Sequence, residues 1–192
     1  MTGFNDLSKD NNKVNNGNQA ISVERLVTIA VMAALTFVAA FVLHIPYING
    51  NVLHMGDGFV FIGAIILGPM GGAISAAIGM SLFDVISGYA VWAPFTFVIK
   101  AVMAVIVGCL SNGLRSQDVK TSDWVKAIIG MIIAAAFMCA GYYVAEGLIY
   151  GNWQSPILSL PGNIAQSGLG VIVAILVTGA LWKTPFKRDF IK

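Results

Sequence analysis

The sequence predicts an all-α integral membrane protein, a compact bundle of six transmembrane helices with both termini in the cytoplasm. Its composition is the first reason: 57% of the 192 residues are hydrophobic and 10% are charged. The mean hydropathy is +0.81, whereas about 25% of the residues of a soluble domain are charged. The formal net charge of +2 offers no excess of positive charge for nucleic acid. A lipid bilayer is therefore the expected surrounding, and no nucleic-acid partner is expected.

Apolar runs long enough to form helices are the second reason. They cover residues 23–43, 59–86, 95–110, 125–150 and 164–182. The run 59–86 is interrupted at 68–72, Gly-Pro-Met-Gly-Gly, where Pro69 removes a backbone donor and the flanking glycines favour a tight reversal. Two helices are therefore expected within 59–86, which brings the total to six.

The distribution of basic residues supports the same number. All but Lys100 of the eleven lysine and arginine residues fall into three clusters: Lys9, Lys13 and Arg25; Arg115, Lys120 and Lys126; Lys183, Lys187, Arg188 and Lys192. The connections 44–56, 87–94 and 151–163 contain neither lysine nor arginine. Because basic residues accumulate on the cytoplasmic side, an even number of crossings should separate successive clusters. Six crossings satisfy this condition.

Three regions are expected along the chain. Residues 1–22 are rich in Asn and Asp and predict a disordered cytoplasmic tail rather than a cleavable signal, because the apolar run that follows is long enough to span. Residues 23–183 form the six-helix membrane domain, and residues 184–192 form a basic cytoplasmic tail.

Four ionisable residues interrupt the apolar regions in what should be the outer half of the membrane: Asp57, Asp84, Lys100 and Glu146. Burying charges separately in a bilayer is costly, so one shared, outward-facing pocket is the economical arrangement. Structural alternatives exist: Asp57 as a helix cap or first-turn acid, an Asp84–Lys100 ion pair, and Glu146 as an interfacial carboxylate. Lys100 and Glu146 are the strongest candidates for ligand contact.

Aromatic and amide side chains lie in or beside the expected outer connections. The aromatic residues are Tyr47, Tyr89, Trp92 and Trp153. They suit either membrane anchoring or the bracketing of a flat, partly polar ring. Asn163 and Gln166, expected at the start of the last helix, share one face and offer donors and acceptors for a heteroaromatic ligand.

A pair of small residues marks the first helix. Ala30 and Ala34 lie one turn apart, a spacing that lets another helix approach closely. That helix could belong to the same bundle or to a partner.

Several sequence patterns of enzymes and cofactor sites are missing. The chain lacks a phosphate-binding Gly-x-x-x-x-Gly-Lys loop, His-Glu-x-x-His and Gly-x-Ser-x-Gly. His44 and His54 are too few to indicate a metal site, and Cys109 and Cys139 fit small buried hydrophobes. No cofactor is expected, and energy for uphill transport would have to come from a partner or a coupled ion.

The segment 54–103 resembles the substrate-binding S components of energy-coupling factor (ECF) vitamin transporters, specifically the subgroup associated with hydroxymethylpyrimidine or vitamin B6 compounds. The residues that carry the resemblance are Gly56, Asp57, Gly68, Pro69, Asp84, Gly88, Tyr89, Pro94 and Lys100. The resemblance implies a non-enzymatic subunit of the bacterial cytoplasmic membrane that binds a vitamin or vitamin precursor on the outer side. It also implies partners, a coupling transmembrane subunit and two ATPase subunits.

Site residues follow from the same resemblance. It favours Lys100, Glu146, Trp153, Asn163 and Gln166 as substrate contacts. The polar and aromatic side chains of Asp84, Tyr89 and Trp92 complete the expected set. It implies that Ala30 and Ala34 meet the coupling subunit.

Two other function classes stay open from the residues alone. One is an autonomous ion-coupled carrier of small solutes that uses Asp57 or Asp84. The other is a small integral-membrane enzyme with Glu146 or Asp84 as a general base.

Overall fold

The computed structural model describes residues 22–46, 52–116 and 118–185. Almost all of the expected tails, 1–22 and 184–192, therefore lies outside the described residues, as does Tyr47. The described elements are α2 (Val23–Val42), β1 (His44–Pro46), β2 (Val52–His54), α3 (Gly56–Ile86), α4 (Ala93–Leu110), the short 3-10 helix η2 (Asn112–Arg115), α5 (Thr121–Tyr150) and α6 (Ser155–Leu181).

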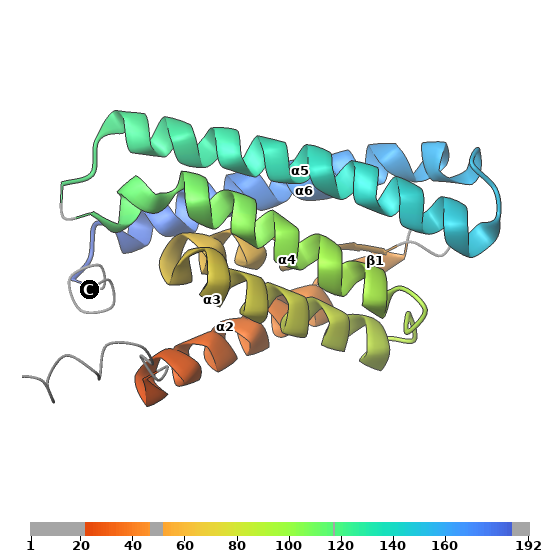
Figure 1. The fold of residues 1–192 in the computed structure, drawn as a ribbon, viewed down its shortest axis with the longest axis horizontal. Coiled ribbons are helices and arrows are strands. Elements are labelled where there is room, and N and C mark those ends of the chain that lie inside the picture. Colours follow the sequence, from red (N-terminus) through yellow and green to blue (C-terminus); the bar gives the residue numbers. More distant parts are fainter. Residues whose placement is uncertain (1–21, 47–51, 117, 186–192) are drawn as a thin grey trace, which may run out of the picture.

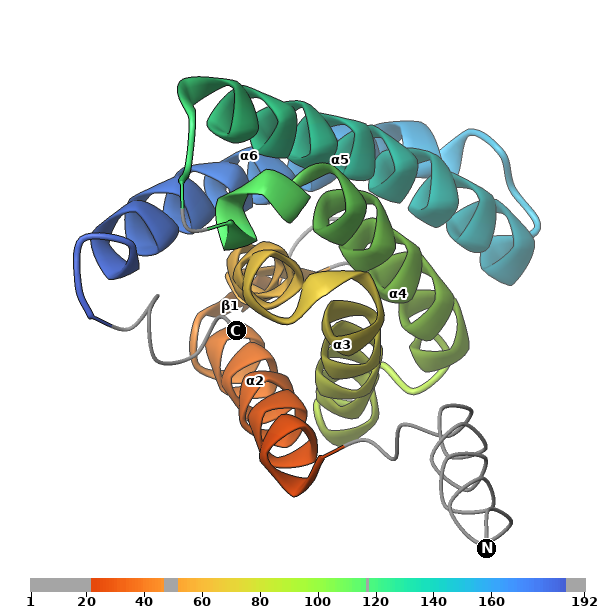
Figure 2. The same cartoon turned by 60° about the vertical axis from the view of Figure 1, so that its left-hand side comes forward.

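The helices form an elongated bundle (Figure 1). Within the described residues, five helices are long and apolar enough to cross a membrane: α2, α3, α4, α5 and α6. The all-α membrane class is therefore confirmed. Helix α3 packs against α2, α4 and α6, and α5 packs against α4 and α6, so α3 occupies the centre of the bundle (Figure 2).

Helix α3 reverses its direction at Gly68. This residue has φ 75° and ψ −175°, outside the helical region, in the left-handed half of the map that glycine tolerates. The two arms, 56–67 and 69–86, lie against each other: a methyl group on Gly72 would lie 2.6 Å from Ala64 Cα. In a straight helix, residues 56 and 80 would be about 36 Å apart. Here a methyl group on Gly56 would touch the Met80 sulfur at 2.5 Å.

Arg115 supports this reversal. Where the first arm of α3 ends, its last carbonyl groups lose their helical partners. The Arg115 guanidinium donates to Ile65 O at 3.1 Å and to Gly108 O at 2.9 Å, so one side chain joins the ends of α3's first arm and α4. Gly108 lets α4 cross the reversal closely, since a methyl group there would lie 2.6 Å from Pro69 Cα.

The outer surface is apolar, as a lipid-facing surface should be. Exposed large hydrophobic residues run along α2, α5 and α6, for example Val31, Leu35, Ile132, Ile172 and Leu176. The interior contains Phe61, Phe83, Met80, Met103 and Met138, all fully buried.

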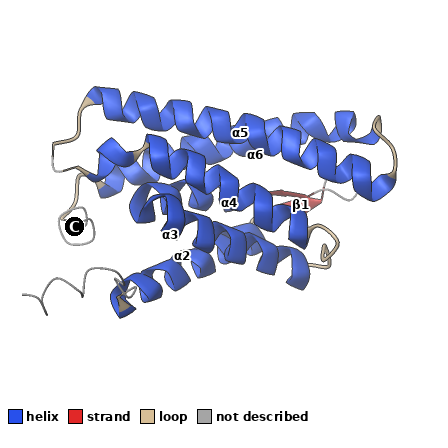
Figure 3. Cartoon of the chain, in the orientation of Figure 1, coloured by secondary structure: helices blue, strands red, loops and turns tan. Residues whose placement is uncertain are grey.

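Two features differ from the sequence prediction. A two-stranded hairpin, β1 paired antiparallel with β2, occupies the connection between α2 and α3 (Figure 3). The last helix begins at Ser155 rather than near Asn163, and it continues through Pro161. Pro156 in the first turn favours this earlier start, because its missing N–H would have had no helical partner there.

Candidate ligand-binding site

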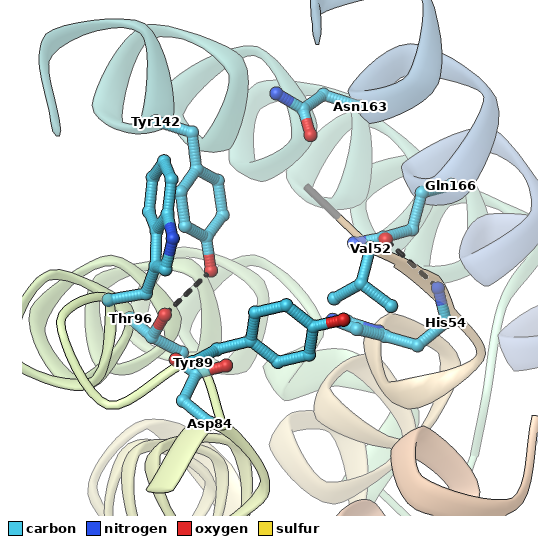
Figure 4. A pocket seen from close by; sticks show the side chains of 9 residues that line it. Val52, His54, Asp84, Tyr89, Thr96, Tyr142, Asn163 and Gln166 are labelled. Carbon is cyan, nitrogen blue, oxygen red and sulfur yellow. Dashed lines mark hydrogen bonds between the residues drawn. The ribbon is translucent and has the colours of Figure 1, made fainter. Parts of the chain in front are cut away.

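A cavity of about 30 Å³ lies among the hairpin, the α3–α4 connection and helices α3, α4, α5 and α6. Figure 4 shows its lining, which consists of Val52, His54, Asp84, Tyr89, Trp92, Thr96, Tyr142, Asn163 and Gln166. It sits toward the end of the bundle that carries the hairpin and the α3–α4 and α5–α6 connections, opposite the end where α2 begins and α6 ends (Figure 1). Five residues singled out in the sequence therefore line one cavity: Asp84, Tyr89, Trp92, Asn163 and Gln166.

Two polar atoms of the lining residues have no hydrogen-bond partner in the described structure. They are Asp84 Oδ2 and His54 Nδ1. The Asp84 side chain is buried, with 5% of its residue surface exposed. A buried polar atom without a partner costs about 1–3 kcal/mol, so a hydrogen-bond partner at either atom would be stabilising.

Aromatic rings form much of the wall. The Tyr89 side chain lies across the cavity between Asp84 and His54 (Figure 4). Trp92 packs on Tyr142 with ring centroids 6.3 Å apart. The Tyr142 hydroxyl is hydrogen-bonded to Thr96 Oγ1 at 3.1 Å, which fixes the Tyr142 ring beside the cavity. Such walls suit a flat ring.

Gln166 is held at both ends of its amide. Its Nε2 donates to Asp57 Oδ2 at 2.9 Å, and its Oε1 accepts from the His54 backbone N–H at 3.1 Å. Helix α6 is thereby tied to the first turn of α3 and to β2.

Lys100 is fully buried behind this layer and does not line the cavity. Its ammonium donates to Asp57 Oδ1 at 2.5 Å, lies 3.1 Å from the Met138 sulfur and stands 5.3 Å from the centre of the Tyr142 ring. The alternative of an ion pair between Lys100 and Asp84 is therefore wrong, because Lys100 pairs with Asp57. The reversal of α3 puts Asp57 between α4 and α6, within reach of the lysine, so the tertiary arrangement overrides proximity in sequence.

Asp57 is a first-turn acid of α3 rather than its N-cap, which is one of the two structural roles that the sequence left open. The residue at the N-cap of α3 is Met55, and Asp57 occupies the first turn, where its carboxylate points into the bundle. Lys100 balances its charge, and the Gln166 amide donates a hydrogen bond to its second oxygen.

Comparison with known proteins identifies the family. The family model described as ECF-type riboflavin transporter, S component, matches residues 20–183. The chain belongs to this family. It is a multi-pass membrane protein, the S component of an ECF transporter, which binds a small vitamin-type substrate and works with a transmembrane coupling subunit and ATPase subunits. The family is one of transporter components rather than of enzymes.

The chain is also similar to individual proteins. The thiamine precursor transporter HmpT of Lactococcus lactis is 25% identical over 173 residues, which covers 89% of this chain and 95% of HmpT. A protein of Pyrococcus woesei, described as an uncharacterized protein in gap 3'region, is 31% identical over 128 residues, 63% of this chain and 81% of the relative. A solved structure, described as the S component of a bacterial ECF transporter, matches with a TM-score of 0.65 at 22% identity, covering 83% of this chain and 96% of that chain. This last likeness confirms the fold.

Two expected contacts of this S component lie elsewhere. Glu146 is buried near the end of α5, where its Oε1 accepts hydrogen bonds from Ser155 Oγ at 2.9 Å and Ser159 Oγ at 3.1 Å. Trp153 is 52% exposed, and its backbone carbonyl accepts from the Tyr143 hydroxyl. Neither side chain lines the cavity, because Glu146 is turned toward the serines of α6 and Trp153 lies on the surface of the α5–α6 connection.

Helix α2 divides its small residues between two faces. Ala33 is buried, and a methyl group on Gly79 of α3 would lie 2.5 Å from its carbonyl oxygen, so this face packs inside the bundle. Ala30 and Ala34 are exposed. Packing within the described bundle therefore does not account for them.

Sequence reasoning missed His54, Thr96 and Tyr142 as lining residues. A tyrosine within an apolar run was a usable signal for Tyr142, because its hydroxyl must find a partner in the membrane. His54 could not be assigned to the cavity from the sequence, since the β1–β2 hairpin is what brings it there. Burial lowers the pKa of His54 to about 4, against the opposing charge of Asp57, so its ring is neutral at physiological pH. Among the described residues, no group of three or more His, Cys, Asp or Glu could hold a metal ion.

Proposed function

We propose that this S component captures a one-ring vitamin or vitamin precursor, hydroxymethylpyrimidine or a vitamin B6 compound, and delivers it to an ECF importer. The observation that carries the proposal is the unpartnered carboxylate oxygen of Asp84 in an aromatic-walled cavity. HmpT, a relative over most of the chain, is described as a thiamine precursor transporter, which supports the pyrimidine.

The cavity chemistry favours a small heteroaromatic ring with N–H or O–H donors. A carboxylate only accepts hydrogen bonds, so Asp84 calls for a donor such as an exocyclic amine, a ring N–H or a hydroxyl. Tyr89 and Trp92 supply aromatic faces, and Asn163 supplies an amide. The volume of about 30 Å³ holds about two water molecules, so even one ring requires the Tyr89 side chain to move. A three-ring compound such as riboflavin would need far more space.

Binding of purified protein in detergent, measured by calorimetry without ATP, tests this proposal. The wild type should bind hydroxymethylpyrimidine or a B6 vitamer more tightly than riboflavin. Asp84→Asn should weaken binding by about 5- to 150-fold, the equivalent of about 1–3 kcal/mol for a lost buried hydrogen bond. Asn163→Ala should weaken it in the same direction.

The matched control is Asp118→Asn, which makes the same change at an exposed residue in the α4–α5 connection. It should leave affinity at the wild-type value. Failure of the wild type to bind any of these rings, or an Asp84→Asn variant with unaltered affinity, would overturn the proposal.

We propose further that the chain crosses the membrane six times, with both termini in the cytoplasm and the cavity facing outward. The reversal at Gly68 supports two crossings by α3. Arg25 lies in the first turn of α2, Arg115 and Lys120 lie in the α4–α5 connection, and Lys183 follows α6. These parts of the chain gather at the end of the bundle opposite the hairpin (Figure 1). The first arm of α3, 56–67, is about 18 Å long, so it recesses the cavity into the membrane.

Cysteine labelling tests this topology. After replacement of Cys109 and Cys139, a cysteine at Val91 should react with a membrane-impermeant maleimide in intact cells. A cysteine at Thr184 should react only after the cells are opened. The reverse pattern would show the opposite orientation.

The exposed alanines of α2 support the proposal that Ala30 and Ala34 meet the coupling subunit. Replacing both with leucine should abolish uptake by the assembled transporter and leave vitamin binding by the isolated subunit intact. The matched control replaces Ala136 and Ala140, two exposed alanines one turn apart in α5, with leucine and should leave both activities intact. Uptake into liposomes by this subunit alone would instead favour an autonomous carrier.

A further inference from the structure

We propose that the Gln166 side chain separates two cavities. Asp57 and Lys100 fix the position of this side chain and so limit the size of the substrate. The inference rests on the proposed function, because it assumes that the first cavity receives the ring. It assigns the second cavity as a subsite for an apolar substituent of ring size.

The second cavity is an open groove of about 500 Å³, much larger than the first cavity, and four of its lining residues, Val42, Leu43, Ile45 and Leu169, are 46–68% exposed. It lies between the end of α2, the hairpin and α6. Its lining is mostly apolar and consists of Val42, Leu43, His44, Ile45, Leu53, His54, Met55, Ala165, Gln166 and Leu169. The two cavities share two lining residues, His54 and Gln166, so these side chains form the partition between them.

The orientation of the Gln166 amide is fixed by chemistry. The carboxylate of Asp57 can only accept a hydrogen bond, and the His54 backbone N–H can only donate one. Nε2 must therefore face Asp57 and Oε1 must face His54, as observed. A rotation of Gln166 out of the partition breaks both bonds.

Lys100 keeps this arrangement in place without touching either cavity. It supplies the counter-charge to Asp57, and both side chains are at most 1% exposed. An ionised carboxylate at this depth requires such a partner. Asp57 and Lys100 are thus positioning residues, whereas Gln166 is the residue that blocks the passage.

The occupant of the second cavity follows from continuity with the first. A ring held by Asp84 would direct a substituent toward the partition, and the apolar lining beyond favours an aromatic or aliphatic group over a charged one. With Gln166 in place, only small substituents fit. With Gln166 shortened, the substituent gains an apolar surrounding.

Two probes measure this effect: hydroxymethylpyrimidine and its analogue with a benzyl group in place of the hydroxymethyl group. In the wild type the benzyl analogue should bind far more weakly than the parent. In Gln166→Ala the ratio of the two dissociation constants should shift toward the analogue by about 10- to 100-fold, the value of burying one apolar ring. Asn163→Ala, which enlarges the first cavity only, should leave the ratio at its wild-type value. An unshifted ratio in Gln166→Ala, or an equal shift in Asn163→Ala, would overturn the inference.

A matched pair of double variants tests the positioning residues. Asp57→Asn with Lys100→Met removes both charges but keeps an acceptor for Gln166, whereas Asp57→Leu with Lys100→Met removes the acceptor. Only the leucine variant should shift the ratio of the two dissociation constants toward the benzyl analogue. The comparison requires both double variants to be monodisperse and to have similar melting temperatures. Identical ratios in the two double variants would show that Asp57 does not position Gln166.

Xenon separates failure of this inference from failure of the proposed function. Xenon binds to apolar surfaces of this kind whether or not the vitamin is bound. In pressurised crystals it should occupy the second cavity of the wild type and extend to the space vacated at residue 166 in Gln166→Ala. Xenon density that is the same in both, or a lipid chain filling the second cavity, would overturn the partition. A wild type that binds none of the one-ring vitamins overturns the proposed function instead.

Discussion

The buried ion pair between Lys100 and Asp57 should make a large, measurable contribution to stability. Replacing Lys100 with methionine keeps most of the side-chain volume but leaves the Asp57 carboxylate at most 1% exposed and without its cation. Breaking a buried pair in this way costs about 3–5 kcal/mol, because one uncompensated charge stays behind. Gln166 still donates to Asp57 Oδ2, so we expect the lower part of this range.

Thermal unfolding in detergent, followed by intrinsic tryptophan fluorescence, measures the effect. A loss of about 3 kcal/mol corresponds to a fall of about 6–12 °C in melting temperature for a chain of this length. Asp57→Asn alone should cause a similar fall. The double variant, Asp57→Asn with Lys100→Met, should recover much of the loss, since no buried charge remains.

Two results from these three variants would contradict a stabilising role for the ion pair. If the free energy of unfolding of Lys100→Met lies within about 0.5 kcal/mol of the wild-type value, the pair contributes no more than an ordinary surface contact. If the two single losses simply add in the double variant, the residues act independently.

Three further outcomes follow from the structure. Arg115→Lys should lower stability by about 1–3 kcal/mol, measured by thermal unfolding, because a lysine cannot reach the carbonyls of both α3 and α4; a melting temperature equal to the wild type would contradict this role. Gly108→Ala should destabilise the protein by about 1–3 kcal/mol, because the new methyl group clashes with the reversal of α3. The matched Gly168→Ala, whose methyl group would meet no atom within 4 Å, should be neutral or stabilising. Equal changes in melting temperature would rule out the close crossing of α4 over the reversal. His54 has a pKa of about 4 in the folded protein and near 6.5 in the unfolded chain. As the pH falls, the unfolded chain therefore takes up the proton first, and the free energy of unfolding should fall between about pH 6.5 and about pH 4. In a pH series of melting temperatures, His54→Gln should flatten that slope, and an unaltered slope would assign it to other groups.

Much of the architecture could be read from local sequence. The apolar runs, Pro69 and its neighbouring glycines predicted helices and a reversal, because hydropathy and backbone preferences act over a few residues. The predicted start of the last helix was wrong because it also rested on preferences that act over a few residues. Pro161 and Gly162 have the local preferences of a loop, yet the structure continues α6 through them.

The candidate site was harder to predict. Asp84, Tyr89, Trp92, Asn163 and Gln166 were recognised because polar and aromatic groups stand out in apolar surroundings, and the structure gathers them around one cavity. Glu146 stood out equally but pairs with serines of α6. A polar residue in a membrane segment must find a partner, and sequence alone does not say whether that partner is a ligand or the protein itself.

Composition and local patterns were enough to predict a helical membrane protein, and the resemblance to ECF S components predicted the family. Those properties depend on composition, on the spacing of apolar residues and on motifs that are contiguous in the chain. Three features of the site depend on how the helices pack: Lys100 pairs with Asp57, Gln166 is fixed between Asp57 and the hairpin, and Asp84 is left with an open acceptor. Hydrogen bonds and ion pairs act over about 3 Å, so their partners are set by which helices the reversal at Gly68 brings together.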